Sequence, residues 1–421
     1  MFPRSATLLG APTLIAALLW LGAWMAQKET HVVGGWHLGL RVPTDLQVYL
    51  LAGDRLNEGG LLYDSPLLGE LPFTYPPFAA GVFRWLSTLT PELATIVWQT
   101  SNLLALIAVI LMCFAERRRP VAFFAVLLAV AFLATEPIRG SFFYGQINLI
   151  LMLLVAWDVL PKNNRFAGVG IGIAAGLKLT PAFFVIIFLV QRRFKAAAVS
   201  AGTFLLTVIA GFFVVPDAGT FWLDSMFNSE RVGVHENPGA QSIKSLLVRN
   251  AGIESGLLWL ALALLVTALT AAAAWLALRR GNRTVALALT GLGACLVSPF
   301  SWYHHWVWIV PLTVAVIAAI DSLADARGFL IAQLSALVTL AALFVLLLPY
   351  VSGVLWPEMA YPGPVYLTDN ALWRQAFTGY GVLMILGYLL YAGALELKSR
   401  PAAAPRPARR PPRRDVQPET T

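Results

Sequence analysis

The sequence predicts an all-α polytopic membrane protein, and three observations lead to this fold class. Hydrophobic residues make up 58% of the 421 residues and charged residues only 12%, about half of the charge that a typical soluble domain carries. The mean hydropathy is +0.71. Apolar runs of about 20 residues, the length that crosses a bilayer, recur along the chain. This composition excludes a water-soluble enzyme, a disordered protein and a nucleic-acid binder.

Ten apolar runs are the predicted membrane-spanning helices, and the stretch 166–190 is predicted to be a hairpin of two half-length helices. Its first half is rich in glycine, and Lys178-Leu179-Thr180-Pro181 interrupts it. Proline disfavours helix at the residue before it and removes a backbone donor. Such a break survives in a membrane only where it is buried in protein or lines a wet cavity. The ten runs are residues 6–26, 91–115, 120–137, 146–161, 194–215, 254–278, 284–300, 303–320, 328–350 and 372–395.

The charges between the runs sort by sign, which predicts the orientation. Connections 27–90, 216–253 and 351–371, and the short turns at 136–145 and near 298–305, are mixed or acidic. The other junctions are basic, and the positive-inside rule assigns them to the cytoplasm. A hairpin that enters and leaves on one side lets every junction alternate, which gives about 12 helical segments with both termini inside. The basic junctions are Arg117-Arg118-Arg119, Lys162 with Arg165, Arg192-Arg193 with Lys195, and Arg279-Arg280 with Arg283.

The last 26 residues differ from the rest of the chain. Segment 396–421 is rich in Pro and Arg and holds +4 of the net charge of +8, so we expect a disordered cytoplasmic tail near anionic lipid. Residues 1–395 then form one integral-membrane domain. Cys113 and Cys295 lie inside apolar runs, which argues against a disulfide framework and a zinc site.

The first outer loop carries the first candidate site residue, Asp45. Thr44-Asp45 opens an amphipathic stretch after Pro43, and the helix dipole favours a carboxylate in a first turn. Asp45 is therefore either a helix cap or a functional carboxylate, and spacing alone favours the cap. Further along the loop, 73–78 is a rigid aromatic segment before a second amphipathic helix over 78–90, which we expect at the membrane interface.

Polar residues also stand at the start of run 146–161 and in the middle of the hairpin. Gln146 and Asn148 are costly within a bilayer, so they are expected to contact substrate or to clamp neighbouring helices. Lys178 is the only basic residue deep in an apolar segment. An intramembrane charge suggests function, and a lysine can hold a phosphate as a point charge. The alternative is that Lys178 extends its ammonium to the interface.

An aromatic segment at 298–308 contains two adjacent histidines. His304 and His305 begin a predicted helix, where side chains at neighbouring positions diverge by about 100°. A shared metal ion is therefore a poor interpretation, and a hydrogen-bonding imidazole is a better one. A histidine of the interfacial aromatic belt remains the alternative.

These motifs together resemble glycosyltransferase family 87, integral-membrane sugar transferases of the GT-C class, over roughly residues 1–395. The segment SPFSWYHHWVW is most similar to the polyprenol-phosphate-mannose-dependent α-1,2-mannosyltransferases of phosphatidylinositol mannoside and lipomannan synthesis. Ala240 stands where the family often has asparagine. The motifs, in chain order, are Asp45-Leu-x-Val-Tyr49, Leu62-Tyr63-Asp64, Phe73-Thr-Tyr-Pro-Pro77, Gly145-Gln-Ile-Asn148, Ala175-Gly-Leu-Lys-Leu-Thr-Pro181, Gln241-Ser242 and Ser298-Pro-x-Ser-Trp-x-His-His-Trp306.

The resemblance implies a GT-C type bundle in the cytoplasmic membrane with an extracytoplasmic active site. It makes Asp45 the leading candidate for the base that takes the proton of the acceptor hydroxyl. The donor would be a β-linked polyprenyl-phosphate mannose and the product α-linked, so the anomeric centre inverts. Donor-binding candidates are Lys178, His304, His305, Tyr75, Gln146 and Asn148, and acceptor-binding candidates are Asp64, Gln241 and Trp302.

The resemblance also sets the expected partners. They are the polyprenyl-phosphate-mannose donor, a glycolipid acceptor and membrane lipids, with no nucleic acid and no metal ligand set. No P-loop and no dinucleotide-binding glycine motif occurs in the sequence, and no cofactor is expected.

Two other functions are compatible with parts of the pattern. The same family includes enzymes that use polyprenol-phosphate arabinose, so an arabinofuranosyltransferase is the first alternative, and nothing in the spacing excludes it. A lipid-sugar flippase or transporter is the second. Transporters often carry broken helices in matching halves, whereas this sequence has one broken hairpin and polar loops on one side.

Overall fold

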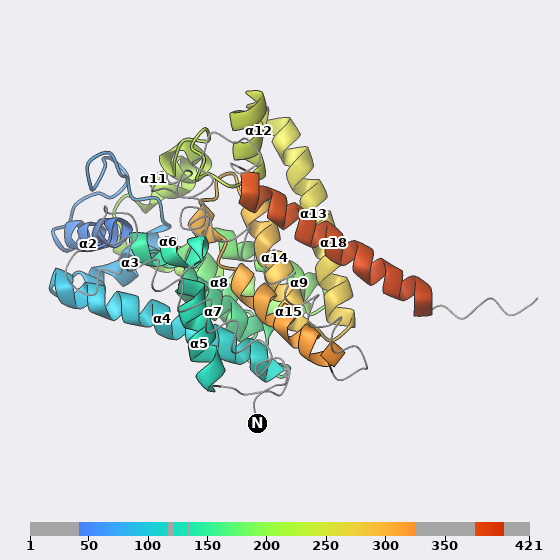
Figure 1. Cartoon of the computed structure of the whole chain (residues 1–421). Coiled ribbons are helices and arrows are strands. Elements are labelled where there is room, and N and C mark those ends of the chain that lie inside the picture. Colours follow the sequence, from blue (N-terminus) through green and yellow to red (C-terminus); the bar gives the residue numbers. More distant parts are fainter. Residues whose placement is uncertain (1–41, 117–121, 134, 325–374, 400–421) are drawn as a thin grey trace, which may run out of the picture.

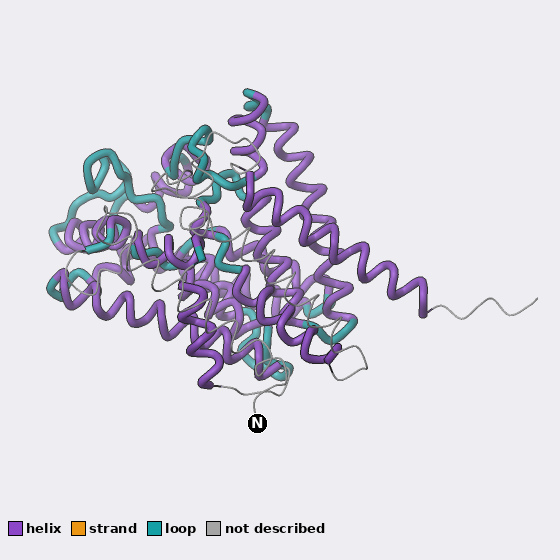
Figure 2. Tube along the Cα trace, in the orientation of Figure 1, coloured by secondary structure: helices purple, strands orange, loops and turns teal. Residues whose placement is uncertain are grey.

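The computed structural model describes residues 42–116, 122–133, 135–324 and 375–399, and this part of the chain is helical without β-strands (Figure 2). It contains two isolated β-bridges, Leu68 with Leu71 and Ala240 with Trp302. The all-α prediction is therefore confirmed for these residues. The α-helices are α2 (Thr44–Asn57), α3 (Pro77–Leu86), α4 (Pro91–Glu116), α5 (Ala122–Leu133), α6 (Glu136–Tyr144), α7 (Asn148–Val159), α8 (Val169–Leu177), α9 (Val185–Val190), α10 (Phe194–Val214), α11 (Ala218–Leu223), α12 (Ile243–Ala251), α13 (Gly256–Arg279), α14 (Arg283–Val297), α15 (Ile309–Ala324) and α18 (Ala376–Ser399). The 3₁₀ helices are η1 (Thr180–Phe184), η2 (Ser225–Phe227), η3 (Ser229–Arg231) and η4 (Tyr303–His305).

Four described helices are long and apolar enough to cross a membrane: α4, α10, α13 and α18. They match four of the predicted runs. Helices α5 and α6 would form a fifth span if they are counted together, although they meet at 76°. The total of about 12 segments stays a prediction. Predicted spans 6–26 and 328–350, loop 351–371, Arg117-Arg118-Arg119 and the tail beyond residue 399 lie outside the described residues.

The predicted break in the hairpin is confirmed. Helix α8 ends at Leu177, Lys178 takes an extended conformation (φ −156°, ψ 132°), and Pro181 stands in the first turn of η1. Glycines let α8 pack closely on α10, because a Cβ at Gly176 would lie 2.2 Å from the hydroxyl oxygen of Thr207. Helix α8 is thus held along α10, and the break leaves Lys178 outside regular structure; the return of the segment to the same side of the membrane stays a prediction.

Two predicted boundaries are wrong. The stretch 136–145 is not a turn, because residues 136–144 form the nine-residue helix α6. Pro137 lies in its first turn, where the missing N–H of proline costs nothing, and Gly145 ends it in the left-handed region at φ 72°. The predicted span 303–320 begins later than expected, since α15 starts only at Ile309, after η4.

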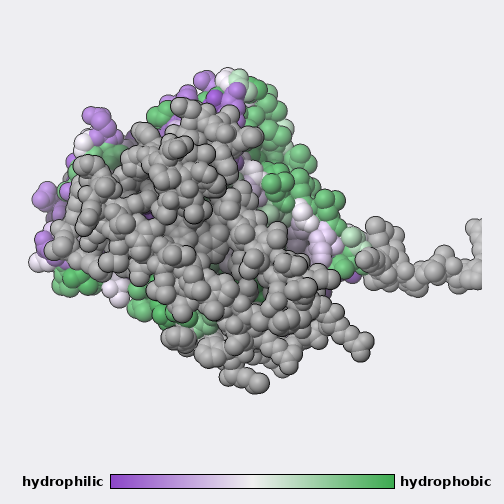
Figure 3. Space-filling view, in the orientation of Figure 1, coloured by the Kyte–Doolittle hydropathy of each residue, from purple (hydrophilic) through white to green (hydrophobic). Residues whose placement is uncertain are grey.

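The short central helices position the site. Helices α7, α8 and α14 lie between α2–α4 on one side and α13 and α18 on the other (Figure 1). The contacts agree, because α7 packs on α4 and α8, and α14 packs on α13 and α15. Hydrophobic residues gather along the edge formed by α13, and hydrophilic residues gather over α2 and near α12 (Figure 3). The first loop meets residues 216–253 directly, because the backbone N–H groups of Leu62 and Tyr63 donate to the Asp217 carboxylate at 2.9 and 2.7 Å.

Candidate functional site

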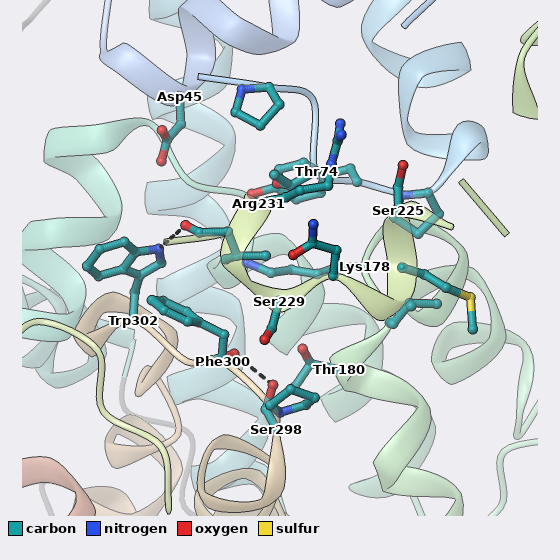
Figure 4. Close-up of a pocket in the computed structure, with 18 of the residues that line it drawn as sticks. Asp45, Thr74, Lys178, Thr180, Ser225, Ser229, Arg231, Ser298, Phe300 and Trp302 are labelled. Carbon is teal, nitrogen blue, oxygen red and sulfur yellow. Dashed lines mark hydrogen bonds between the residues drawn. The ribbon is translucent and has the colours of Figure 1, made fainter. Parts of the chain in front are cut away.

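A cavity of about 260 Å³ lies where segments far apart in the sequence meet (Figure 4). Its walls come mainly from the start of α2, residues 71–76, the break of the hairpin, residues 225–232 and residues 298–305. Four of these segments carry residues that the sequence singles out, and Tyr75 is the one in segment 71–76. Asp45, Lys178 and His305 all line this one cavity.

Asp45 does not act as a helix cap. Pro43 is the N-cap of α2, and no side chain caps the helix. The Asp45 carboxylate instead accepts a hydrogen bond from Nε2 of Gln146. Burial raises the pKa of the Asp45 carboxyl to about 6, and the Gln146 hydrogen bond and the charge of Lys178 limit this rise. A carboxylate with a pKa near neutrality that faces a cavity is suited to general-base chemistry.

Gly145 lets α2 approach Gln146. Its φ of 72° is a left-handed conformation that glycine adopts without strain. A Cβ at this position would also lie 2.8 Å from the Cβ of Leu46 and 2.9 Å from that of Pro43. The chain can therefore turn from α6 into α7 directly against the start of α2, which brings Gln146 to Asp45.

Gln146 connects Asp45 to two other groups. Its Oε1 accepts a hydrogen bond from the hydroxyl of Tyr75 at 3.0 Å and one from Nζ of Lys178 at 3.5 Å. The Tyr75 hydroxyl lies 2.6 Å from that of Tyr49. The amide of Gln146 thus lies between carboxylate and ammonium, so the two charges share a partner without pairing directly.

Lys178 is held from several directions. Its Nζ donates to Oδ1 of Asn148 at 3.1 Å, lies 3.0 Å from Nε2 of His305 and sits 5.3 Å from the ring centroid of Tyr75. Asn148 in turn donates to the carbonyl oxygen of His304 at 2.8 Å. Asn148 does not line the cavity. It positions Lys178 by accepting a hydrogen bond from its ammonium.

His305 presents a second donor beside Lys178. Its Nδ1 accepts a hydrogen bond from the backbone N–H of Trp302 at 3.2 Å. A neutral imidazole carries one proton, so this bond assigns that proton to Nε2, the atom nearest Lys178. With this tautomer, two donors lie side by side at the cavity wall, where one anionic oxygen in the cavity can accept a hydrogen bond from each.

The two histidines have different surroundings. Ring nitrogens of His304 are buried without a hydrogen-bond partner among the described residues. Its ring lies near those of Tyr144 and Trp302, at centroid distances of 5.2 and 6.1 Å. His304 does not line the cavity. The structure therefore brings His305, and not the ring of His304, to the site.

The three acceptor-binding candidates also differ in whether they line the cavity. Trp302 lines the cavity and donates from Nε1 to the carbonyl of Val232 at 3.2 Å. Asp64 lies outside it, exposed and 3.8 Å from Arg55. Gln241 is fully buried, and its Oε1 accepts from the backbone N–H of Thr378 at 3.3 Å. Asp64 and Gln241 are thus not brought together with Asp45.

The structure adds Arg231 to the cavity wall (Figure 4). Sequence reasoning missed it because Arg231 stands between Glu230 and Val232 in a mixed-charge connection, where no spacing distinguishes it. The other arginine of this region, Arg249, donates to carbonyls of Asn237 and Ala240 at 3.0 and 2.9 Å and so clamps the backbone. Within the described ranges, no group of three or more His, Cys, Asp or Glu side chains is arranged to hold a metal ion.

Comparison with known proteins gives one family and several similar proteins. The model of glycosyltransferase family 87 matches residues 73–299, just over half of the chain. A Mycobacterium tuberculosis (strain CDC 1551 / Oshkosh) protein named polyprenol-phosphate-mannose-dependent alpha-(1-2)-phosphatidylinositol pentamannoside mannosyltransferase is 36% identical over 283 residues, 65% of this chain and 66% of that protein.

Two further relatives carry a related name, polyprenol-phosphate-mannose-dependent alpha-(1-2)-phosphatidylinositol mannoside mannosyltransferase. The Mycobacterium tuberculosis (strain ATCC 25618 / H37Rv) protein is 32% identical over 325 residues, 71% of this chain and 76% of that protein. The Mycolicibacterium smegmatis (strain ATCC 700084 / mc(2)155) protein is 33% identical over 351 residues, 74% of this chain and 77% of that protein. No solved structure gives a significant match.

Proposed function

Because the chain belongs to glycosyltransferase family 87, we propose that its cavity transfers mannose from a polyprenyl-phosphate-mannose donor to a lipid-linked mannoside. The acceptor is of the phosphatidylinositol mannoside type, the new linkage is α-1,2, and the anomeric centre inverts. The names of the relatives support this donor and this acceptor class. The observation that carries the proposal is a carboxylate and a cation in one cavity, separated by the amide of Gln146.

Inversion requires the acceptor oxygen and the leaving oxygen to lie on opposite sides of the anomeric carbon. Asp45 takes the proton of the acceptor hydroxyl while that oxygen forms its bond to the carbon. The bond from the carbon to the phosphate oxygen breaks, and its electron pair goes to the phosphate. Lys178 and Nε2–H of His305 hold that phosphate by charge-assisted hydrogen bonds. Phosphate is a good leaving group, so no separate general acid is needed.

Tyr75 and Gln146 hold the base in place. Tyr75 donates to Gln146, and Gln146 donates to Asp45. An amide nitrogen has no lone pair for the proton of the acceptor, so Gln146 orients the carboxylate without competing as a base. Trp302 offers an aromatic face in the cavity, which suits the apolar face of an acceptor sugar.

We propose that the cavity opens on the outer face of the cytoplasmic membrane, as the charge distribution of the junctions indicates. Asn57 lies in the first outer loop and Lys162 in a basic junction. A cysteine that replaces Asn57 is expected to react with a membrane-impermeant thiol reagent in intact cells, and a cysteine that replaces Lys162 only after permeabilisation. Equal labelling of both in intact cells would reject this orientation.

The function is tested with purified, detergent-solubilised protein. Polyprenyl-phosphate mannose and polyprenyl-phosphate arabinose are offered separately with a phosphatidylinositol mannoside acceptor, and products are read by mass spectrometry. We expect one added hexose from the mannose donor, sensitive to an α-1,2-mannosidase, and no product with Asp45→Asn. A pentose product from the arabinose donor would instead assign the chain to the arabinosyl branch. Movement of lipid-linked sugar across vesicles without any product would indicate a transporter.

The two histidines are expected to differ in effect. His305→Ala removes a hydrogen-bond donor to a charged phosphate, which is worth about 1.5–3 kcal/mol, so kcat/KM for the donor should fall about 10-fold or more. His304→Ala leaves the carbonyl that Asn148 contacts and should lower stability more than it changes donor use. Initial rates at varied donor concentration, with thermal unfolding of each variant, check this. Equal kinetic losses in both variants would contradict it.

A further inference from the structure

Residues 225–232 form a wall of the cavity, and hydrogen bonds within the segment and to α12 hold this wall in place. The side chain of Asn228 accepts a hydrogen bond from the backbone N–H of Glu230 and so caps η3. Ser229 lines the cavity and accepts a hydrogen bond from Nζ of Lys244 at 3.1 Å. Its hydroxyl lies 3.2 Å from Nε2 of the buried His235, and the other nitrogen of that ring lies 3.0 Å from the hydroxyl of Ser245. This network ties η3 to α12.

Arg231 ends η3 and presents its side chain to the cavity (Figure 4). Its Nε is buried and has no hydrogen-bond partner, and the side chain makes no hydrogen bond or ion pair with any described residue. A buried, unpaired guanidinium nitrogen is costly, so a folded protein normally supplies a partner. The partner that matches a guanidinium inside a substrate cavity is an anionic group of the substrate.

The charge of the leaving group changes during the reaction. The donor is a phosphodiester with one negative charge. After the carbon–oxygen bond breaks, the product is a polyprenyl phosphate monoester, whose second pKa is about 6, so near pH 7 it carries almost two negative charges. Lys178 already has Gln146, Asn148 and His305 around it. A second cation in the same cavity can match the charge that appears only as the bond breaks.

We propose that Arg231 binds the leaving phosphate and stabilises the second negative charge that develops on it. This inference rests on the proposed function. The balance is complete without a further reactant: the acceptor oxygen bonds to the anomeric carbon, its proton goes to Asp45, and the electron pair of the broken bond stays on the phosphate. An interaction that strengthens in the transition state raises kcat, whereas one made equally in the ground state changes only the donor KM.

The test compares two ligands that differ by one charge. Polyprenyl phosphate has the charge of the product, and its methyl ester has the single charge of the donor. Binding of each to the purified full-length chain at pH 8 is measured by titration calorimetry. Arg231→Met is expected to weaken binding of polyprenyl phosphate about 10-fold or more and binding of the methyl ester less than about 3-fold. The kcat of Arg231→Met should fall about 10-fold or more, and its donor KM should stay nearly unchanged.

Matched variants keep the result interpretable. Arg231→Lys retains a positive charge and should recover part of the discrimination between the two ligands, which also shows that the position tolerates substitution. Arg84→Met removes a charge from an exposed arginine that donates to Asn57 outside the cavity and should behave as wild type. Equal weakening of both ligands in Arg231→Met, or of neither, would overturn the proposal. If the wild-type chain binds neither ligand, the proposed function itself fails.

Discussion

Asp45→Asn is expected to lower turnover by about 100-fold or more while the protein still folds. The amide of asparagine is nearly isosteric with the carboxylate, and its oxygen can still accept the hydrogen bond from Gln146. It cannot take the proton of the acceptor hydroxyl, and a positioned general base contributes about 10²–10⁴-fold to a rate. Initial rates with saturating donor and acceptor measure the effect, and size-exclusion chromatography in detergent checks the fold.

Asp54→Asn is the matched control, because Asp54 is an exposed carboxylate on the same helix α2 and lies outside the cavity. It should keep near-normal turnover. Near-normal turnover in Asp45→Asn, with a large loss in Asp64→Asn, would show that the base is the other carboxylate of the first loop.

The pH dependence of kcat/KM is a second test of Asp45 as the base. The pKa of Asp45 is raised to about 6 by burial, and only the ionised carboxylate can accept a proton. The value of kcat/KM should therefore be nearly constant above pH 7 and fall about 10-fold per unit as the pH drops below 6. In wild type this acid limb lies well above the ordinary range of an aspartate. A limb near pH 4 would mean that Asp45 is not the base.

Lys178→Met is expected to raise the donor KM about 10- to 100-fold and to leave the acceptor KM nearly unchanged. Methionine fills the volume of the lysine stem but carries no charge, and a hydrogen bond to a charged group is worth about 1.5–3 kcal/mol. The acceptor sugars need not touch this position. The charge of Lys178 also lowers the pKa of Asp45, so the acid limb should move to higher pH in this variant.

Steady-state rates with donor and acceptor varied separately measure the Lys178→Met effect. Lys195→Met removes an exposed lysine at the start of α10, outside the cavity, and serves as the control. An unchanged donor dependence in Lys178→Met would reduce Lys178 to an interfacial lysine and leave the phosphate to His305 and Arg231.

The parts of the fold that could be predicted are those governed by local chemistry. Hydropathy located α4, α10, α13 and α18, because a lipid-facing helix must be apolar along its whole length. Pro181 located the break at Lys178 because proline removes a backbone donor and disfavours helix at the residue before it. Helix α6 was missed because the stretch 136–145 stands between two predicted runs and was expected to be only their connection, although Pro137 suits the first turn of a helix. Within α6, Arg139 pairs with Glu136 one turn earlier, and Ser141 donates to the distant carbonyl oxygen of His304 at 3.1 Å, a tertiary contact that composition does not reveal.

The site was predictable only where a residue type is unusual for its segment. Lys178 is conspicuous inside an apolar run, and Asp45 stood out through the resemblance of its motif. The contact between Asp45 and Gln146 depends on the close approach of two helices that Gly145 permits. This approach is a feature of tertiary packing, which local sequence does not show. His304 belongs to the same motif as the cavity residues Trp302 and His305, yet its ring is buried away from the cavity. Motif membership therefore marks a region, and packing decides which side chains face the cavity.

The bond between Gln146 and Asp45 also determines how the enzyme returns to its starting state. If Asp45 is the base, as proposed, it holds a proton after each transfer, and the amide of Gln146 cannot pass that proton on to Tyr75, whose own pKa burial raises above its ordinary value. The proton therefore leaves through the cavity, to water or to the departing phosphate, whose second pKa is also about 6. With a pKa of about 6 for Asp45, loss of that proton is favoured by about ten to one at neutral pH. In the proposed mechanism, every sugar transferred therefore releases one proton on the side to which the cavity opens.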